Sequence, residues 1–283
     1  KLGISKIPEI ILDNTDRNRT SPFAFTGNKF EFRAVGSSAN CGGPMMTLNV
    51  IVAEVLQDLH KEIEKEMEAG KEKKIAIVDV LRKYIKESKK IRFEGDGYSE
   101  EWAKEAQKRG LSNFKSTPEA LDVYTKKSTK QLFEKHKVLN HIEVHARHEI
   151  ELEAYIKKVQ IESRVMGDLA LNHIIPTAIL YQNKLIENAN GLKGLGLDHS
   201  AAVESIKEIS KHLATLQSDV NGMTEARKQL NKEEDVTKRA KGYQSKVKEA
   251  YFDKIRYAVD KLELLVDDES WPLVKYRELL FIR

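Results

Sequence analysis

The chain lacks several features that would place it in a specialised class of protein. Its 283 residues include one cysteine, Cys41, which excludes an internal disulfide and favours a reducing compartment. No apolar run approaches the roughly 20 residues that a membrane span needs, and no secretory signal is present. Internal repeats and low-complexity segments are also missing. We therefore expect a cytoplasmic protein with no membrane partner.

The chain also lacks a large excess of positive or of negative charge. The sequence has 48 basic and 44 acidic residues, a net charge of +4, and its basic runs are interleaved with glutamate. Proteins that bind nucleic acid usually gather their cations on one face, so we expect no nucleic-acid partner. The length is sufficient to bury a sizeable core, in more than one unit.

Helical patterning dominates the chain after residue 46. The pattern predicts one long helix from about Lys127 to Met166, and Pro176 then kinks the next helical segment or separates two helices. Apolar residues recur at helical spacing in that helix and in three further stretches, two of which are joined by a short polar turn and predict an antiparallel hairpin. The stripes are Leu48, Ile51, Val52, Val55, Leu56 and Leu59; Leu132, Leu139, Ile142, Ile156, Val159 and Met166; Val203, Ile206, Ile209, Leu213, Leu216 and Val220; and Tyr251, Ile255, Ala258, Leu262 and Leu265.

A short β-strand near the start carries the densest chemistry. Phe30 and Phe32 alternate with Glu31 and Arg33, a period of two that predicts a strand with a carboxylate beside a guanidinium on one face. Arg17, Arg19 and Lys29 lie on the approach to this strand. Cations of this density beside an acid suit an anionic substrate with a metal ion. By pattern alone, an ion pair on an exposed sheet face is the commoner explanation.

The amino-acid sequence of this region resembles that of a known family. The chain reads Asn18-Arg19-Thr20-Ser21-Pro22, then Phe30-Glu31-Phe32-Arg33, then Ser38-Ala39-Asn40-Cys41. These motifs are similar to the C-terminal catalytic segment of glutamine synthetase, and the longer run from Arg17 to Arg33 resembles type III, the long bacterial form. The closing segment from Trp271 to Arg283 is similar to the tail of type III chains, so the resemblance spans the whole chain.

The resemblance implies an activity and its partners. The family joins glutamate and ammonia at the expense of ATP, through a γ-glutamyl phosphate, with Mg²⁺ or Mn²⁺ as the metal. Family members assemble as homo-oligomers, dodecamers of two stacked hexameric rings. The residues alone leave the choice between Mg²⁺ and Mn²⁺ open, and they leave open which helices make subunit contacts.

Carried over from the family, the roles fall on particular residues. Glu31 is implied as a ligand to the divalent cation, and Arg33 as a contact on the substrate side of the site. Arg19 matches the loop arginine that contacts the transferring phosphate. Lys29 stands where other types carry an arginine near the nucleotide phosphates.

One departure from the family pattern is plain. Other types have a second arginine five residues after the loop arginine, and this chain has Ala24 there. Either Arg17 substitutes in binding the nucleotide, or the nucleotide contacts are distributed differently.

The resemblance also implies an organisation. We predict a predominantly α-helical chain with a short N-terminal β segment, forming the C-terminal part of a larger α+β catalytic domain plus a helical bundle or hairpin. Residues 1–46 would be the end of the catalytic domain, 47–190 a helical continuation, and 191–283 the hairpin and tail. The isolated chain would then be inactive. The alternative is a non-catalytic helical scaffold or a regulatory or oligomerisation module.

Three histidines and the single cysteine are further candidates for a functional site. His141, His145 and His148 share one predicted helical face and could bind zinc, but Leu152 and Val159 continue that face, which favours a partly buried apolar stripe. Cys41 has no neighbouring base to make it a nucleophile, so a small buried filler is expected there.

Overall fold

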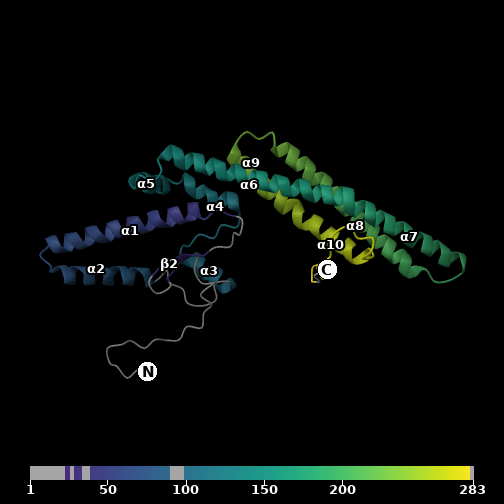
Figure 1. The fold of residues 1–283 in the computed structure, drawn as a ribbon, viewed down its shortest axis with the longest axis horizontal. Helices are drawn as coiled ribbons and strands as arrows, with labels where there is room; N and C mark the ends of the chain where they lie inside the picture. The colour runs from purple at the N-terminus through teal and green to yellow at the C-terminus, as the bar shows by residue number, and fades with distance from the viewer. Residues whose placement is uncertain (1–22, 26–28, 34–38, 90–98, 281–283) are drawn as a thin grey trace, which may run out of the picture. The chain divides into compact units, whose positions relative to one another are not determined.

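The structure is a computed structural model that describes residues 23–25, 29–33, 39–89 and 99–280. It forms two compact units (Figure 1). Unit 1 comprises Lys1–Phe114 with Lys127–His141, and unit 2 comprises Lys115–Lys126 with Ile142–Arg283. The described residues are mainly helical with two short strands near the start, so the predicted fold class is confirmed. None of the described helices is both long and apolar enough to cross a membrane.

Unit 1 begins with a two-stranded antiparallel ribbon and continues as helices. Its largest helices, α1 and α2, pack on each other, and Lys83 of α2 donates to Glu62 of α1 at 2.8 Å. The turn between them contains Gly70, whose φ of 92° lies in the left-handed region that favours glycine. The elements of unit 1 are β1 (Phe23–Phe25), β2 (Phe30–Phe32), α1 (Gly42–Glu68), α2 (Lys73–Ser88), α3 (Glu100–Lys108) and α5 (Lys127–Lys135).

The predicted apolar stripe of α1 forms the expected helix but stays largely uncovered. Val50, the one buried residue of α1, falls outside the predicted stripe, whereas Ile51, Val55 and Leu56 of the stripe remain exposed, Leu56 at 57%. Within the described part of unit 1, α2 and α5 pack on α1 without covering these side chains. Helical periodicity therefore predicted the element correctly, but it does not specify the partner that would bury this face.

The single helix predicted from Lys127 to Met166 is wrong. The structure breaks it into α5 and α6 (His141–Leu169), because Lys137 adopts a φ of 53°. The Val138 N–H then donates to the Phe133 carbonyl at 3.1 Å and the Lys137 N–H to the Glu134 carbonyl at 3.0 Å. This pair of bonds is the Schellman termination of a helix. The residue at its left-handed position is usually glycine, so a lysine there gave no sequence signal.

Unit 2 is a bundle of three long helical rods that lie side by side (Figure 1). The first rod is continuous from α6 through a π-helical turn, η3, to α7; the second is α8; the third runs from α9 through the π-helical η4 to α10. The remaining elements and bounds are α4 (Thr117–Leu121), η2 (Asp122–Thr125), η3 (Ala170–Ile174), α7 (Ile175–Gly194), α8 (Ser200–Leu230), α9 (Val236–Gly242), η4 (Tyr243–Phe252), α10 (Asp253–Leu265) and α11 (Tyr276–Leu279).

The contacts along α8 show that it runs antiparallel to the third rod. The α carbon of Gly242 faces Leu230, while that of Gly222 faces Tyr251, so residue numbers fall on α8 as they rise on its partner. The two stripes predicted for this hairpin are buried or half-buried throughout. Its seam lies in the core cluster of unit 2, whose fully buried members include Leu152, Val159, Ile209, Leu216, Val220, Met223, Tyr243, Val247, Ile255 and Leu262.

Pro176 lies inside the first rod and does not separate two helices. The rod passes through it because the preceding turn is π-helical, with the Ile175 N–H donating to the carbonyl of Ala170. Proline has no N–H and crowds the preceding turn. A widened π turn just before it relieves that conflict while the helix continues.

Candidate functional site

The densest charge on the N-terminal ribbon lies on one face of β2. The Glu31 carboxylate accepts from Arg33 Nη2 at 2.9 Å and Nε at 3.3 Å, and lies 3.3 Å from Lys29 Nζ. We call these three residues the β2 charge cluster. The side chain of Arg33 is 21% exposed, that of Glu31 37% and that of Lys29 66%. The sequence predicted Glu31 and Arg33 on one face of the strand, and the structure adds Lys29, which directly precedes β2, to that face.

The opposite face of the ribbon is aromatic. Phe23 and Phe30 stack with ring centroids 4.7 Å apart and planes 15° apart. Phe23 is paired with Phe32 across the ribbon. The aromatic pair helps to fix the register of the two strands, because cross-strand side-chain pairs stabilise a ribbon. That register in turn determines which position faces Glu31.

The position facing Glu31 is Ala24. The strands pair antiparallel with Ala24 opposite Glu31, and directly paired residues share a face of the sheet. An arginine at position 24, as in other types of the family that the motif resembles, would therefore lie beside the Glu31 carboxylate. In this chain the cations next to Glu31 come from its own strand. Arg17 and Arg19, the other predicted site residues, lie outside the described residues.

The charge cluster favours an ionised carboxylate. Hydrogen bonds from Arg33, and then from Lys29, lower the pKa of Glu31 below its usual value. An ionised carboxylate is the form that binds a divalent cation, and about four lone-pair positions on its two oxygens exceed the bonds made here. The guanidinium of Arg33 is a planar fork, the shape that binds carboxylate and phosphate groups bidentately.

One carboxylate is too few to hold a divalent cation. Mg²⁺ takes about six oxygen ligands in octahedral geometry. Among the described residues there is no group of three or more histidine, cysteine, aspartate or glutamate side chains that could hold a metal. The donor set fits a metal only if Glu31 is one ligand among several, with the others supplied from outside the described residues.

The turn after β2 leads into α1 through Asn40 and Cys41. The Gly42 N–H donates to Asn40 Oδ1 at 2.7 Å, which satisfies one of the unpaired donors at the start of the helix. Cys41 is exposed, so the expectation of a buried filler is wrong. It directly precedes the first turn of α1, where no described element packs over it.

The three histidines separate in the structure. His141 and His145 are exposed, and His145 lies 3.7 Å from Glu149, whereas His148 is buried. Nε2 of His148 has no hydrogen-bond partner among the residues that the structure describes, and the centroid of its ring lies 6.4 Å from that of Tyr124. Burial lowers the pKa of His148. The apolar-stripe interpretation is therefore correct for His148, and no zinc cluster forms among the described residues.

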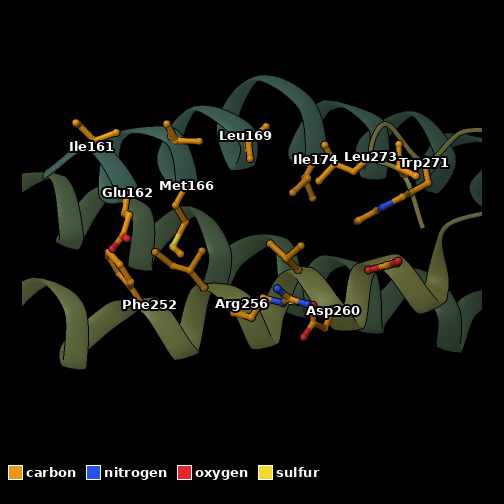
Figure 2. Close-up of a pocket in the computed structure, with 15 residues that line it drawn as sticks. Ile161, Glu162, Met166, Leu169, Ile174, Phe252, Arg256, Asp260, Trp271 and Leu273 are labelled. Carbon is orange, nitrogen blue, oxygen red and sulfur yellow. Dashed lines mark hydrogen bonds and ion pairs between the residues drawn. The ribbon is translucent and has the colours of Figure 1, made fainter. Parts of the chain in front are cut away.

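Unit 2 contains a hollow that the sequence did not indicate. It is a groove of about 620 Å³ between α6 and α10, closed at one end by Trp271 and Leu273, and we call it the C-terminal groove (Figure 2). Met166 and Ile255 belong to predicted stripes, but Ile161 and Val165 fall outside them. The groove arises because the third rod and the tail leave these side chains uncovered, which helical periodicity alone cannot show.

Comparison with known proteins extends the resemblance. Residues 76–193 match the family model of the glutamine synthetase C-terminal domain. The chain is 50% identical over 289 residues to a glutamine synthetase of Bacteroides fragilis (strain YCH46), covering 100% of this chain and 40% of that protein. It is 36% identical to a type-3 glutamine synthetase of Dictyostelium discoideum, covering 100% of this chain and 39% of that protein. A glutamine synthetase of Butyrivibrio fibrisolvens is 33% identical over 95% of the chain and 38% of its own length.

These matches confirm the resemblance to glutamine synthetase and to its type III form. The chain spans about two fifths of the length of these relatives.

Proposed function

We infer from these matches that the chain is the C-terminal part of a type III glutamine synthetase, and we propose that the whole protein is an ATP-dependent glutamate–ammonia ligase. In the proposed reaction the γ-phosphoryl group of ATP passes to the side-chain carboxylate of glutamate and ADP leaves. Ammonia then displaces phosphate from the γ-glutamyl phosphate to give glutamine. The observation that carries this proposal is the β2 charge cluster, set within a chain that matches glutamine synthetases from end to end.

We assign roles to the cluster by its chemistry. Glu31 would be one ligand of Mg²⁺ or Mn²⁺, which would neutralise developing charge on the phosphate oxygens. Arg33 would hold an anionic group of the substrates through its planar fork. Lys29 would hold nucleotide phosphates as a point charge. Arg19 would contact the transferring phosphate, and Arg17 would supply the cation that other types of the family provide with an arginine at the position of Ala24.

Two features of unit 1 support a larger parent protein. The ribbon β1–β2 has three residues in each strand, and a two-stranded ribbon is at best marginally stable by itself in water. The exposed apolar stripe of α1 follows it directly. We propose that the upstream part of the parent supplies further strands and covers this stripe. On the family resemblance we also propose that the parent assembles as a dodecamer of two hexameric rings, and on the single cysteine of this chain that it is cytoplasmic.

The test is the substitution Glu31→Gln in the full-length protein. Replacing a charged metal ligand by an amide should lower glutamine formation by more than about 10²-fold, the scale for loss of one strong electrostatic contact at a transition state. The apparent affinity for the metal should fall as well, which a titration of activity with Mg²⁺ and Mn²⁺ would measure. A turnover close to that of the unchanged enzyme would contradict the proposed role.

The matched control is Glu62→Gln. Glu62 also accepts a lysine bond, from Lys83, but on the exposed surface of the α1–α2 hairpin. It should leave turnover and metal dependence unchanged. If both variants lose activity equally, the effect of Glu31→Gln is structural.

The isolated chain provides a second test. Residues 1–283 alone should form no glutamine and bind ATP weakly, because the described residues supply one carboxylate for a metal that needs several ligands. Measurable turnover by the isolated chain would refute the view that the site is completed upstream. If the parent proves inactive as well, the chain is better explained as a helical scaffold.

A further inference from the structure

The C-terminal groove is apolar along its length and acidic at its rim. Ile161, Val165 and Leu169 line it from α6, and Val259 lines it from α10. Figure 2 shows Phe252, Arg256 and Asp260 along one side and Met166 and Ile174 along the other. Large apolar side chains left in water are unfavourable. A groove of this composition therefore suits an apolar segment.

The charges at the rim indicate which kind of segment fits. Three carboxylates line the groove, on Glu162, Asp260 and Glu263, against one guanidinium, on Arg256. Arg256 Nε lies 2.6 Å from Asp260 Oδ1, so this cation already pairs with one of the acids. The rim keeps a net negative charge. An apolar segment that also carries a basic residue would complement both features.

The tail of the chain has this composition and enters the groove at one end. Trp271, Leu273 and Val274 already line it. At the end of α11, Leu279 and the following Leu280 are 70% and 60% exposed. They are followed in the sequence by Phe281, Ile282 and Arg283, which lie outside the described residues. The segment from Leu279 to Arg283 is thus four apolar residues and one base.

We propose that the closing residues Phe281 to Arg283 dock into the C-terminal groove, with Phe281 and Ile282 against the apolar wall and Arg283 at the acidic rim. The segment continues the contact that Trp271, Leu273 and Val274 have begun. This proposal is independent of the catalytic roles assigned to the β2 charge cluster.

The chain is long enough for this docking. Val165 lies nine residues before Ile174 on the first rod, about 14 Å along its axis. From Val274 to Phe281 there are seven residues, of which α11 takes four. Four residues at 1.5 Å and three extended residues at 3.3 Å span about 16 Å. The chain from Val274 to Phe281 is therefore as long as the stretch of the first rod from Ile174 to Val165.

A disulfide trap tests the docking in the full-length protein, with Cys41→Ser to remove the native thiol of this segment. Val165→Cys combined with Phe281→Cys should form a disulfide within one chain under mild oxidation. The control combines Leu180→Cys with Phe281→Cys. Leu180 is 64% exposed against 51% for Val165, so its thiol would be at least as accessible, but it lies on α7 outside the groove.

The readout is the same for both pairs. Trypsin cleaves after Arg164 and Lys184, so positions 165 and 180 lie in one peptide, and Phe281 lies in the peptide that follows Arg277. Mass spectrometry of the linked peptides should show at least a tenfold excess of the disulfide in the Val165 pair. On a denaturing gel without reductant, the protein that carries this disulfide should run as a monomer. Equal yields in the two pairs would overturn the proposal, and linked dimers would show that the tail of a second copy occupies the groove.

Thiol accessibility gives a second, independent measurement. With Val165→Cys alone, deletion of residues 281–283 should speed alkylation of that thiol several-fold, because the groove loses its cover. The same deletion should leave alkylation of Leu180→Cys unchanged. An unchanged rate at position 165 would overturn the docking even if the disulfide trap failed for geometric reasons.

Discussion

Tyr243 joins the three rods of unit 2, and its hydroxyl can be removed without disturbing the packing of its ring. The side chain is fully buried on η4, and its hydroxyl donates to Asn231 Oδ1 at 2.6 Å. Gln160 of α6 donates to the same hydroxyl at 3.4 Å and to Asn231 Oδ1 at 3.2 Å. Asn231 directly follows α8. The network therefore ties the end of α8 to both other rods.

We expect Tyr243→Phe to destabilise unit 2 by about 1–1.5 kcal/mol. The phenyl ring stays, so no cavity forms. One well-formed hydrogen bond is lost, worth about 0.5–1.5 kcal/mol net, while the long bond from Gln160 adds little. Asn231 Oδ1 is not left unsatisfied, because Gln160 still donates to it. Asn231 is also exposed, so the substitution carries no penalty for a buried unpaired oxygen.

The measurement is urea unfolding followed by the fluorescence of Trp271, with Trp102→Phe so that the signal comes from unit 2. The midpoint should fall while the dependence on urea stays the same, as expected for a change in stability alone. Tyr257→Phe is the control, since Tyr257 is 60% exposed on the neighbouring α10 and its hydroxyl should contribute within about 0.5 kcal/mol. Equal effects of the two substitutions would refute the argument that the buried network stabilises the bundle.

Two further predictions concern His148 and Lys137, besides those for Glu31 and the tail. Burial lowers the pKa of His148, so its contribution is complete above the unfolded pKa of about 6.5 and is lost as the pH falls below it. The free energy of unfolding of unit 2 should therefore fall less steeply with decreasing pH in His148→Gln, by at most about 1.4 kcal/mol per pH unit. Urea midpoints measured at pH 7, 6 and 5 would contradict this if they fell equally in the variant and in the unchanged protein. Lys137→Gly should stabilise unit 1 by about 0.5–1 kcal/mol, because the left-handed conformation costs lysine about 1–2 kcal/mol and glycine loses part of that gain in the unfolded chain. A lower melting temperature for the glycine variant would show that the lysine side chain contributes more than its backbone costs.

Sequence patterns predicted the parts of this protein that depend on local spacing. The alternation placed Arg33 on the same strand face as Glu31, and the structure brings these two together with Lys29, which the sequence had placed on the approach to the strand. The stripes from Val203 to Val220 and from Tyr251 to Leu265 predicted the hairpin of α8 and α10. In these cases the periodicity of a strand or helix by itself determines which residues share a face.

The backbone conformation of single residues could not be predicted from sequence spacing in the same way. Gly70 and Gly196 adopt positive φ at helix ends, where glycine is the expected residue. Lys137 does the same without a glycine, and the helix predicted across it was wrong. Pro176 signalled a break, yet a π turn before it keeps the rod continuous. The energies involved are small enough for tertiary packing to override a local preference.

The sequence by itself determined the helical class, the charged face of β2 and the motifs that match glutamine synthetase. The tertiary structure alone decided that Ala24 lies opposite Glu31, that His148 is buried while His145 is not, and that Ile161 and Val165 line a groove. It also left the stripe of α1 uncovered. The physical reason is that spacing along a chain determines which side chains share a face, whereas burial depends on which surface, distant in sequence, comes to lie against that face.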